Sequence, residues 1–160
     1  DGDDYINEYG AGVNFIDGGK GNDNIEVYNY MAGENSTVIG GEGNDYISGS
    51  SGYFYGNEGN DNLSGSGLLD GGVGNDNLMG SNNADTYIFG RDYGVDTLTD
   101  QQIYTINDGT TQGTINTIQL LAGVVESDIV LNRIGPNLLL LIQGTTDQLI
   151  INNYFNDIIR

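Results

Sequence analysis

The sequence predicts an all-β fold: a parallel β-roll, which is a right-handed solenoid with two short strands in each coil, followed by a small β-rich C-terminal cap. Three observations predict it. A glycine-rich acidic segment recurs along the N-terminal part of the chain, and single apolar residues stand at fixed distances on either side of each copy. The later part changes to strand-like apolar runs separated by turn residues. We therefore assign the roll to residues 1–100 and the cap to residues 101–160.

The repeated segment occurs in four full copies, which read GGKGNDNIE, GGEGNDYIS, GNEGNDNLS and GGVGNDNLM, and in a truncated copy at Gly2–Ile6. Their aspartates are separated by 19, 22, 16 and 15 residues and are Asp4, Asp23, Asp45, Asp61 and Asp76. Self-similarity at such a period is typical of solenoids. Because the first residue falls inside a copy of the repeat, we expect the chain to be a fragment of a longer protein.

Two apolar positions in each repeat predict two strands. One follows the aspartate by two residues, and the other precedes the glycine-rich turn by two: Ile6, Ile25, Ile47, Leu63 and Leu78, and Ile16, Val38, Phe54 and Leu69. Each points inward from a short strand, while glycines supply the positive φ values of the turns. Stacked coils then place the aspartates in a row along one edge, about 5 Å apart.

The opposite edge and the end of the roll depart from this pattern. The short turns GSSG and GSG lack an aspartate, and the first acidic residue on that edge is Asp85. The segment Ala84–Leu98 reads as a last coil, in which Asp96 closes the row above Asp76. Asp100–Thr114 reads as a linker. Strand-like runs at residues 116–120, 129–132, 138–142 and 149–151 form the predicted cap, which covers the exposed solenoid end.

The charge restricts the partners. With 23 acidic and 4 basic residues the net charge is −19, which disfavours nucleic acid and anionic membranes and favours cations. The chain has no cysteine and no histidine, so zinc, copper and haem sites and Ser-His or Cys-His catalysis have no ligands or bases here. Low hydrophobicity and many glycines also suit a disordered chain, unless bound cations neutralise the repeat.

The four nonapeptides match G-G-x-G-x-D-x-U-x, and the chain thereby resembles the RTX (repeats-in-toxin) family of calcium-binding β-rolls. The resemblance extends to the final coil and to the cap with its closing NNYF, and so covers nearly the whole chain. It implies that calcium ions lie between successive turns, bound by the motif aspartates and by backbone carbonyls. It also implies export by a type I secretion system and folding outside the cell, where calcium is abundant.

Calcium prefers six to eight oxygen ligands in irregular geometry, which glycine turns and one aspartate per coil can supply. The predicted metal-binding residues are Asp4, Gly18, Gly19, Lys20, Gly21, Asp23, Gly40, Gly41, Glu42, Gly43, Asp45, Gly56, Asn57, Glu58, Gly59, Asp61, Gly71, Gly72, Val73, Gly74, Asp76, Asp85 and Asp96.

For several of these residues the prediction of metal binding rests on less. Lys20, Glu42, Glu58 and Val73 occupy the variable third place, where only the carbonyl would matter. Asn57 replaces the second glycine, which questions the backbone geometry there. Asp85 would give one ion on the second edge, although both Asp85 and Asp96 could instead be ordinary capped turns.

The sequence thus predicts a calcium-binding, secreted, non-catalytic module that folds on binding several calcium ions and stabilises its parent protein. Two alternatives stay open. One is an adhesion or glycan-binding module that uses Tyr28, Tyr30, Tyr53 and Tyr55. The other is the non-catalytic C-terminal part of a secreted hydrolase or epimerase, whose activity would lie upstream.

Overall fold

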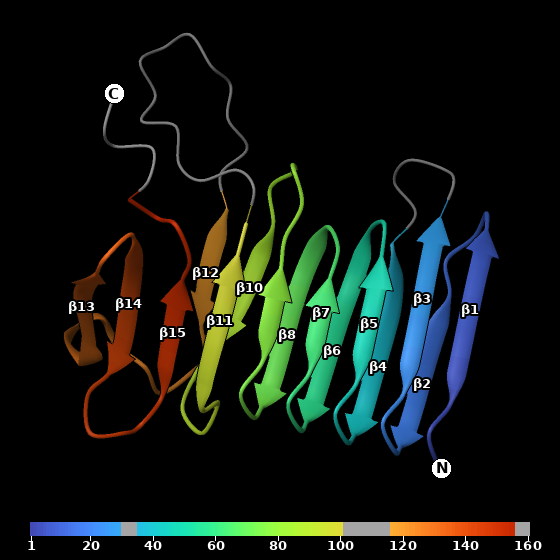
Figure 1. Ribbon diagram of the computed structural model, residues 1–160, viewed down its shortest axis with the longest axis horizontal. Helices are drawn as coiled ribbons and strands as arrows, with labels where there is room; N and C mark the ends of the chain where they lie inside the picture. Colours follow the sequence, from blue (N-terminus) through green and yellow to red (C-terminus); the bar gives the residue numbers. More distant parts are fainter. Residues whose placement is uncertain (30–34, 101–115, 156–160) are drawn as a thin grey trace, which may run out of the picture.

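The computed structural model describes residues 1–29, 35–100 and 116–155, and these form an all-β protein (Figure 1). The predicted parallel β-roll is confirmed. Among the described residues the only helical element is a short 3-10 turn, η1 (Glu126–Asp128), so none of them forms a helix long and apolar enough to span a membrane. The predicted linker and the loop that holds Tyr30 lie largely outside the described residues.

The chain alternates between two sheets, as a solenoid requires. Sheet A receives the odd-numbered strands of the roll: β1 (Tyr5–Gly10), β3 (Asn24–Asn29), β5 (Tyr46–Gly49), β7 (Asn62–Ser64), β9 (Asn77–Met79) and β11 (Val95–Thr99). Sheet B receives the even-numbered strands: β2 (Phe15–Lys20), β4 (Ser36–Glu42), β6 (Gly52–Glu58), β8 (Gly67–Val73), β10 (Thr86–Phe89) and β12 (Thr117–Leu120). Within each of these series the neighbouring strands are parallel.

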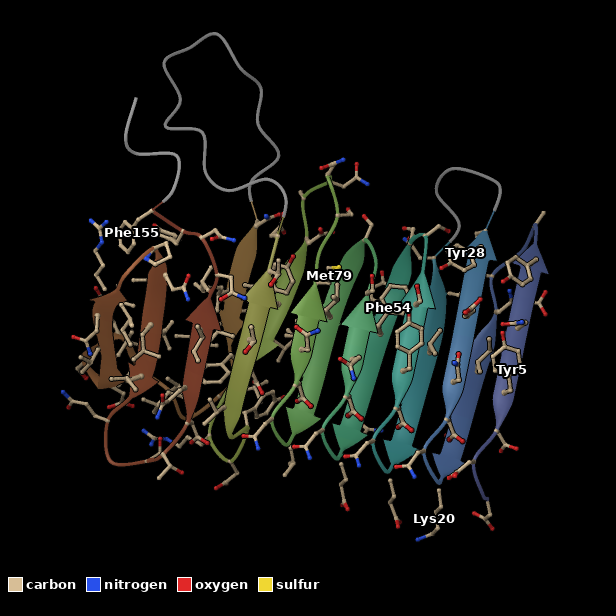
Figure 2. The ribbon with its side chains drawn as sticks, in the orientation of Figure 1. Tyr5, Lys20, Tyr28, Phe54, Met79 and Phe155 are labelled. Carbon is tan, nitrogen blue, oxygen red and sulfur yellow. The ribbon has the colours of Figure 1, made fainter. Side chains whose placement is uncertain are left out.

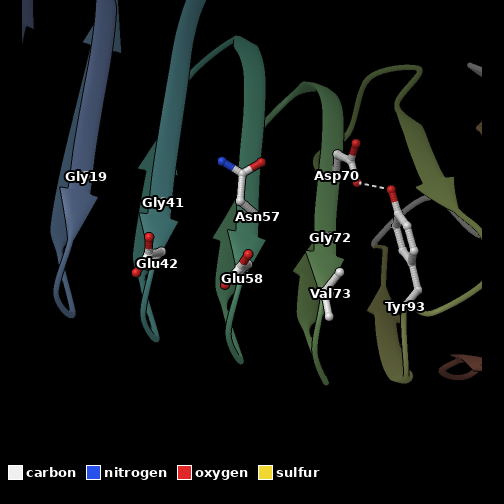
Figure 3. Close-up of a pocket in the computed structure, with 9 residues that line it drawn as sticks. All are labelled: Gly19, Gly41, Glu42, Asn57, Glu58, Asp70, Gly72, Val73 and Tyr93. Atoms are coloured by element: carbon white, nitrogen blue, oxygen red, sulfur yellow. Dashed lines mark hydrogen bonds between the residues drawn. The ribbon is translucent and has the colours of Figure 1, made fainter.

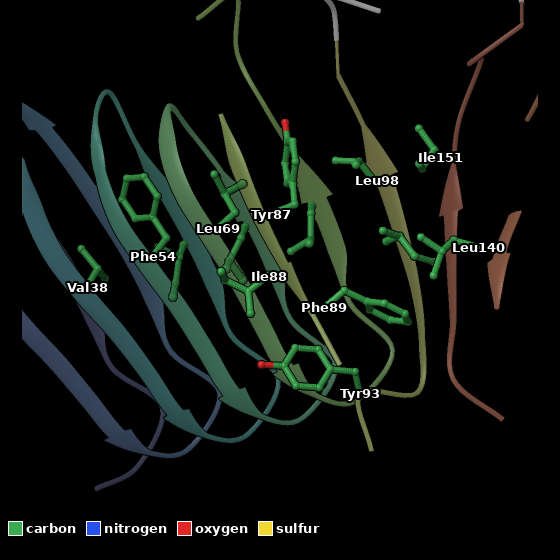
Figure 4. Close-up of a cluster of buried hydrophobic side chains, with 14 of the residues drawn as sticks. Val38, Phe54, Leu69, Tyr87, Ile88, Phe89, Tyr93, Leu98, Leu140 and Ile151 are labelled. Carbon is green, nitrogen blue, oxygen red and sulfur yellow. The ribbon is translucent and has the colours of Figure 1, made fainter. Parts of the chain in front are cut away.

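The predicted apolar positions stack in register and form the core between the sheets. On sheet A, Ile25 pairs with Ile47, Ile47 with Leu63, and Leu63 with Leu78. On sheet B, Val38, Phe54 and Leu69 follow one another in the same way (Figure 4). All of these side chains are at most 1% exposed. Because each coil contributes only one or two large apolar groups, the core is thin and depends on stacking between coils.

The C-terminal strands extend sheet A. β15 (Gln148–Ile151) pairs in parallel with β11, and β14 (Asn137–Ile142) and β13 (Ile129–Ile134) follow in antiparallel order. Leu140, Ile142, Leu149 and Ile151 join the core of the roll. β12 also comes from the segment predicted to form the cap, yet it continues sheet B next to β10. The division of the chain at residue 100 therefore stays a prediction.

Arg91 links the last coil of the roll to the C-terminal strands. Its guanidinium forms an ion pair with Asp128 at 2.8 Å and donates to the carbonyl of Gly123 at 3.3 Å. Since both charged side chains are partly exposed, the pair itself is worth little, and its main effect is to fix the position of the segment before β13.

Candidate metal sites

The turns between the sheets stack along one edge of the roll (Figure 1). Their aspartates form a row, which we call the carboxylate row: Asp4, Asp23, Asp45, Asp61, Asp76 and Asp96. At each step the backbone N–H of one aspartate donates to Oδ1 of the aspartate in the next coil, at 2.7–2.9 Å. One oxygen of each carboxylate from Asp23 to Asp96 thus holds adjacent coils in register. The structure places Asp96 next to Asp76, as the sequence predicted.

A second row runs beside the first and contains the asparagine before each aspartate. Asn22, Asn44, Asn60 and Asn75 each accept, through Oδ1, a backbone N–H from the following coil at 2.7–2.8 Å. The carboxylates accept from the preceding coil, so the two rows join the coils in opposite directions. These asparagines were not among the predicted functional residues, although their recurrence in all four GND triplets was a signal in the sequence.

The second carboxylate oxygen is the notable chemical feature of the edge. Asp23, Asp45, Asp61, Asp76 and Asp96 are at most 2% exposed. Their Oδ2 atoms are buried and have no hydrogen-bond partner among the described residues. A buried carboxylate oxygen without a donor is costly. Each of these five oxygens therefore needs a proton or a cation.

The first glycine of the motif creates the space for that oxygen. A Cβ at Gly18, Gly40, Gly56 or Gly71 would collide with Oδ2 of the aspartate in the same motif. At Gly56 it would also collide with the carbonyl oxygen of Gly71, in the next coil. The unpartnered carboxylate oxygen and a backbone carbonyl of the neighbouring coil therefore both lie against the α-carbon of this glycine, where a larger residue does not fit.

Departures from the motif are accommodated at its second position. Asn57 has φ 78°, in the left-handed region that the equivalent glycines Gly19, Gly41 and Gly72 also occupy. Asparagine tolerates this region better than most residues. The replacement therefore leaves the turn geometry intact, and the question that the sequence raised at this position is answered.

Burial changes the acidity of the row. Loss of hydration, with a smaller contribution from neighbouring carboxylates, raises the pKa of Asp61 to about 7, of Asp76 to about 6 and of Asp96 to about 8. Burial also raises the pKa of Asp45. Charged carboxylates in this row are thus destabilised in the absence of a counter-charge.

The oxygen atoms available here fit a hard cation. Within the described ranges no three acidic side chains converge on one point, so backbone carbonyls would have to supply most of the ligands. Calcium accepts such a set, because it takes six to eight oxygens and tolerates irregular geometry. The carbonyls and Asp side chains of the glycine turns are therefore chemically suited to calcium.

The last coil carries a degenerate copy of the motif that the sequence analysis did not align. Gly94 bridges to Gly74, which places Asp92 at the second-glycine position, and Asp92 has φ 65°. The carboxylate of Asp147 accepts the N–H groups of Gly94 at 2.9 Å and Asp92 at 3.1 Å. The side chain of Asp147 thus caps the backbone N–H groups of the last turn in the row. No motif marks it, and it lies 53 residues from Gly94.

On the second edge, Asp85 has a different environment. Its Oδ1 accepts from the N–H of Gly67 and its Oδ2 from the N–H of Ser81, both at 2.8 Å. Because both oxygens have donors, the geometry is that of a capped turn, which was the alternative reading of Asp85. Asp4 begins the carboxylate row, but its side chain is exposed.

The third-position side chains lie outside the row of unpartnered oxygens. Lys20 and Glu42 form an exposed ion pair. Together with the second-position glycines, Glu42, Glu58 and Val73 line a shallow groove of about 460 Å³ on sheet B (Figure 3). Tyr93 borders the groove and donates a 2.8 Å hydrogen bond to Asp70.

The three tyrosines of the glycan alternative that the structure describes do not lie on one sheet. Tyr28 lies on β3 of sheet A, whereas Tyr53 and Tyr55 lie on β6 of sheet B. Tyr30 is outside the described residues. Phe54 points into the core and Tyr53 outward, as the alternation predicted.

Comparison with known proteins supports the fold. No protein-family model matches the chain, and no curated protein matches it in sequence. Among solved structures, the extracellular lipase LipA from Serratia marcescens is similar, with a TM-score of 0.51 and 19% sequence identity. The match covers 95% of this chain and 36% of the lipase, so the chain spans about a third of that protein's length. At this identity the likeness shows a shared β-roll architecture.

Proposed function

We propose that this chain is an RTX-type calcium-binding module of a secreted bacterial protein, and that its β-roll folds on binding several calcium ions. The observation that carries the proposal is the set of five buried Oδ2 atoms without donors, at Asp23, Asp45, Asp61, Asp76 and Asp96. These aspartates and the carbonyls of the adjoining glycine turns would hold the ions. The bound cations would supply the positive charge that allows buried carboxylates to stay ionised.

Folding and binding are coupled because the two depend on the same residues. The net charge is −19 and the core is thin, while many glycines raise the entropic cost of folding. The unfolded chain has no preformed carboxylate row, so the free energy of ion binding contributes directly to folding. Export in an unfolded state by a type I secretion system, followed by folding outside the cell, fits this coupling.

The role in the parent protein is stabilisation. We infer no catalysis for this segment, which is a β-solenoid without a nucleophile–base pair among its described residues. The structurally similar lipase is an extracellular enzyme, and a hydrolase is accordingly one class of protein to which such a module could be attached. Any activity would reside in a domain outside this sequence.

The proposal is tested by far-UV circular dichroism of the purified chain during a calcium titration, with magnesium as the control ion. A cooperative coil-to-β transition with calcium, and none at equal magnesium, is expected because magnesium demands a stricter octahedron and keeps its waters. Calorimetry would then count the ions. A β spectrum that persists in excess chelator would contradict the coupling.

A further inference from the structure

The outer face of sheet A carries a group of tyrosines at its β1 end that the metal sites do not use. Tyr5 and Tyr46 flank Asn24 in one row across β1, β3 and β5. Tyr9 and Tyr28 pair at the other end of β1 and β3. We call this surface the tyrosine platform; it consists of Tyr5, Tyr9, Tyr28, Tyr46, Asn24 and Glu26. Figure 2 shows Tyr5 near the start of β1 and Tyr28 near the end of β3.

The rings of three platform tyrosines are open to solvent. Tyr5 is 67% exposed, Tyr9 51% and Tyr46 44%. The rings of Tyr9 and Tyr28 are stacked with centroids 5.5 Å apart, and the hydroxyl of Tyr9 donates to Glu26 at 2.8 Å. Cross-strand stacking stabilises a sheet, and this accounts for the pair Tyr9–Tyr28. It does not account for Tyr5 and Tyr46, which are separated by a whole strand.

Asn24 lies between those two rings and has an unusual atom. Its Oδ1 is buried and has no hydrogen-bond partner among the described residues. Tyr5 and Tyr46 are two strand spacings apart, or about 10 Å along the roll, which is close to the length of a disaccharide. A sugar placed across the row could stack its C–H faces on the two exposed rings, over the half-buried Asn24.

We propose that the tyrosine platform binds a neutral polysaccharide that runs along the axis of the roll. Tyrosine supplies rigid apolar area together with a polar tip, which suits a ligand with C–H faces and many hydroxyl groups. The platform contains one carboxylate, Glu26, and no basic residue, so its charge does not favour anionic glycans. A second copy of the chain is disfavoured by a net charge of −19 on each molecule.

The platform uses other side chains than the carboxylate row, although Tyr5, Asn24 and Tyr46 each directly follow one of its aspartates. The platform residues point outward from sheet A, whereas the unpartnered Oδ2 atoms are buried at the turns. The proposal requires a folded roll but does not depend on which ion folds it. A failure of calcium-dependent folding would therefore be seen in the circular dichroism spectrum before any binding is measured.

The test is retention of the whole chain, folded as judged by circular dichroism, on immobilised polysaccharides. Neutral probes are β-glucan, xylan, mannan and N-acetylglucosamine oligomers; anionic probes are alginate and polygalacturonate. The variants are Tyr5→Ala and Tyr46→Ala, with Tyr46→Thr as a strand-compatible replacement if alanine impairs folding. Tyr53→Ala is the matched control, because Tyr53 is 43% exposed on the opposite sheet.

We expect at least one neutral polysaccharide to retain the chain. Each platform substitution should weaken its Kd about tenfold, since truncation of an anchoring aromatic typically costs that much, and Tyr53→Ala should leave it unchanged. Retention only on anionic probes, retention on none, or an equal loss with Tyr53→Ala would each overturn the proposal. So would a dimer in sedimentation experiments that Tyr46→Ala dissociates, because a second copy would then occupy the platform.

Discussion

In the turn that begins at Gly56, Oδ2 of Asp61 lies so close to the α-carbon of Gly56 that a Cβ there would collide with it. The position of the aspartate side chain thus depends on the glycine. The missing side chain at position 1 of the motif leaves room for the carboxylate of position 6, and the carboxylate fills that room with an oxygen that lacks a donor. The same relationship recurs at Gly18, Gly40 and Gly71.

Substitution of Asp61 should separate ion binding from backbone pairing. Asp61→Asn keeps an Oδ1 acceptor for the N–H of Asp45 but removes the buried charge. We expect the calcium midpoint of folding to rise about tenfold, as loss of one anionic ligand implies, whereas the spectrum of the variant in excess chelator should show no less β structure than that of the wild type. Calcium titrations followed by circular dichroism measure both. Asp17→Asn, at an exposed aspartate of β2, is the control and should behave as wild type.

Gly56→Ala should destabilise the calcium-bound roll by about 1–3 kcal/mol, which is the usual cost of adding a methyl group where no space exists. Urea unfolding at fixed calcium gives the change in free energy. Gly10→Ala serves as the comparison, because nothing lies within 4 Å of a Cβ at Gly10. Equal stability of the two variants would show that the carboxylate does not lie over Gly56.

Low pH should partly replace calcium, because protons neutralise the buried carboxylates when no calcium is bound. Burial raises the folded-state pKa of Asp61 to about 7, of Asp76 to about 6 and of Asp96 to about 8, whereas in unfolded chain an aspartate titrates near its ordinary value of about 4. Between these values the folded state binds more protons than the unfolded state. The stability of the ion-free roll should therefore rise as the pH falls through this window and decline as the pH rises.

Circular dichroism in calcium-free buffer between about pH 8 and pH 5 tests this expectation, with Asp61→Asn/Asp76→Asn/Asp96→Asn as the control that should lose most of the dependence. The calcium midpoint should move in the other direction, to higher concentrations at lower pH, because protons and calcium compete for the same oxygens. β structure that decreases steadily on acidification over this range would contradict the assignment.

Asp147 should be as important to the last coil as the motif aspartates are to the others. Its carboxylate accepts the N–H groups of Asp92 and Gly94 and is 4% exposed. Asp147→Ala leaves both donors without this acceptor and should cost about 2–3 kcal/mol. Asp147→Asn, which can still accept one of the two bonds, should lie between. Urea unfolding at fixed calcium measures both, and no effect of either would exclude a stabilising role for this contact.

The repeat determined most of the fold by itself. Its apolar positions, two residues after Asp45 and two residues before Gly56, require two short inward-facing strands per coil, and their stacking puts the aspartates in one row. This inference succeeded because each coil contacts only its neighbours, so a local pattern fixes the long-range structure. Where the repeat ends, as at Asp147 or at the placement of β12 beside β10, there is no repeated pattern from which to predict which residues pair.

Sequence alone therefore determined the two-strand coil, the acidic edge and the chemical suitability of that edge for a hard cation. Tertiary structure decided which oxygens are available. It gave Oδ1 of each carboxylate from Asp23 to Asp96 to a backbone amide, buried Oδ2 without a donor, and satisfied both oxygens of Asp85 with amides. It also placed Tyr53 and Tyr28 on different sheets, and it placed Asn24 between Tyr5 and Tyr46 on neighbouring strands. Which side chains become partners depends on the distances between coils. These distances cannot be predicted from the order of residues along one coil.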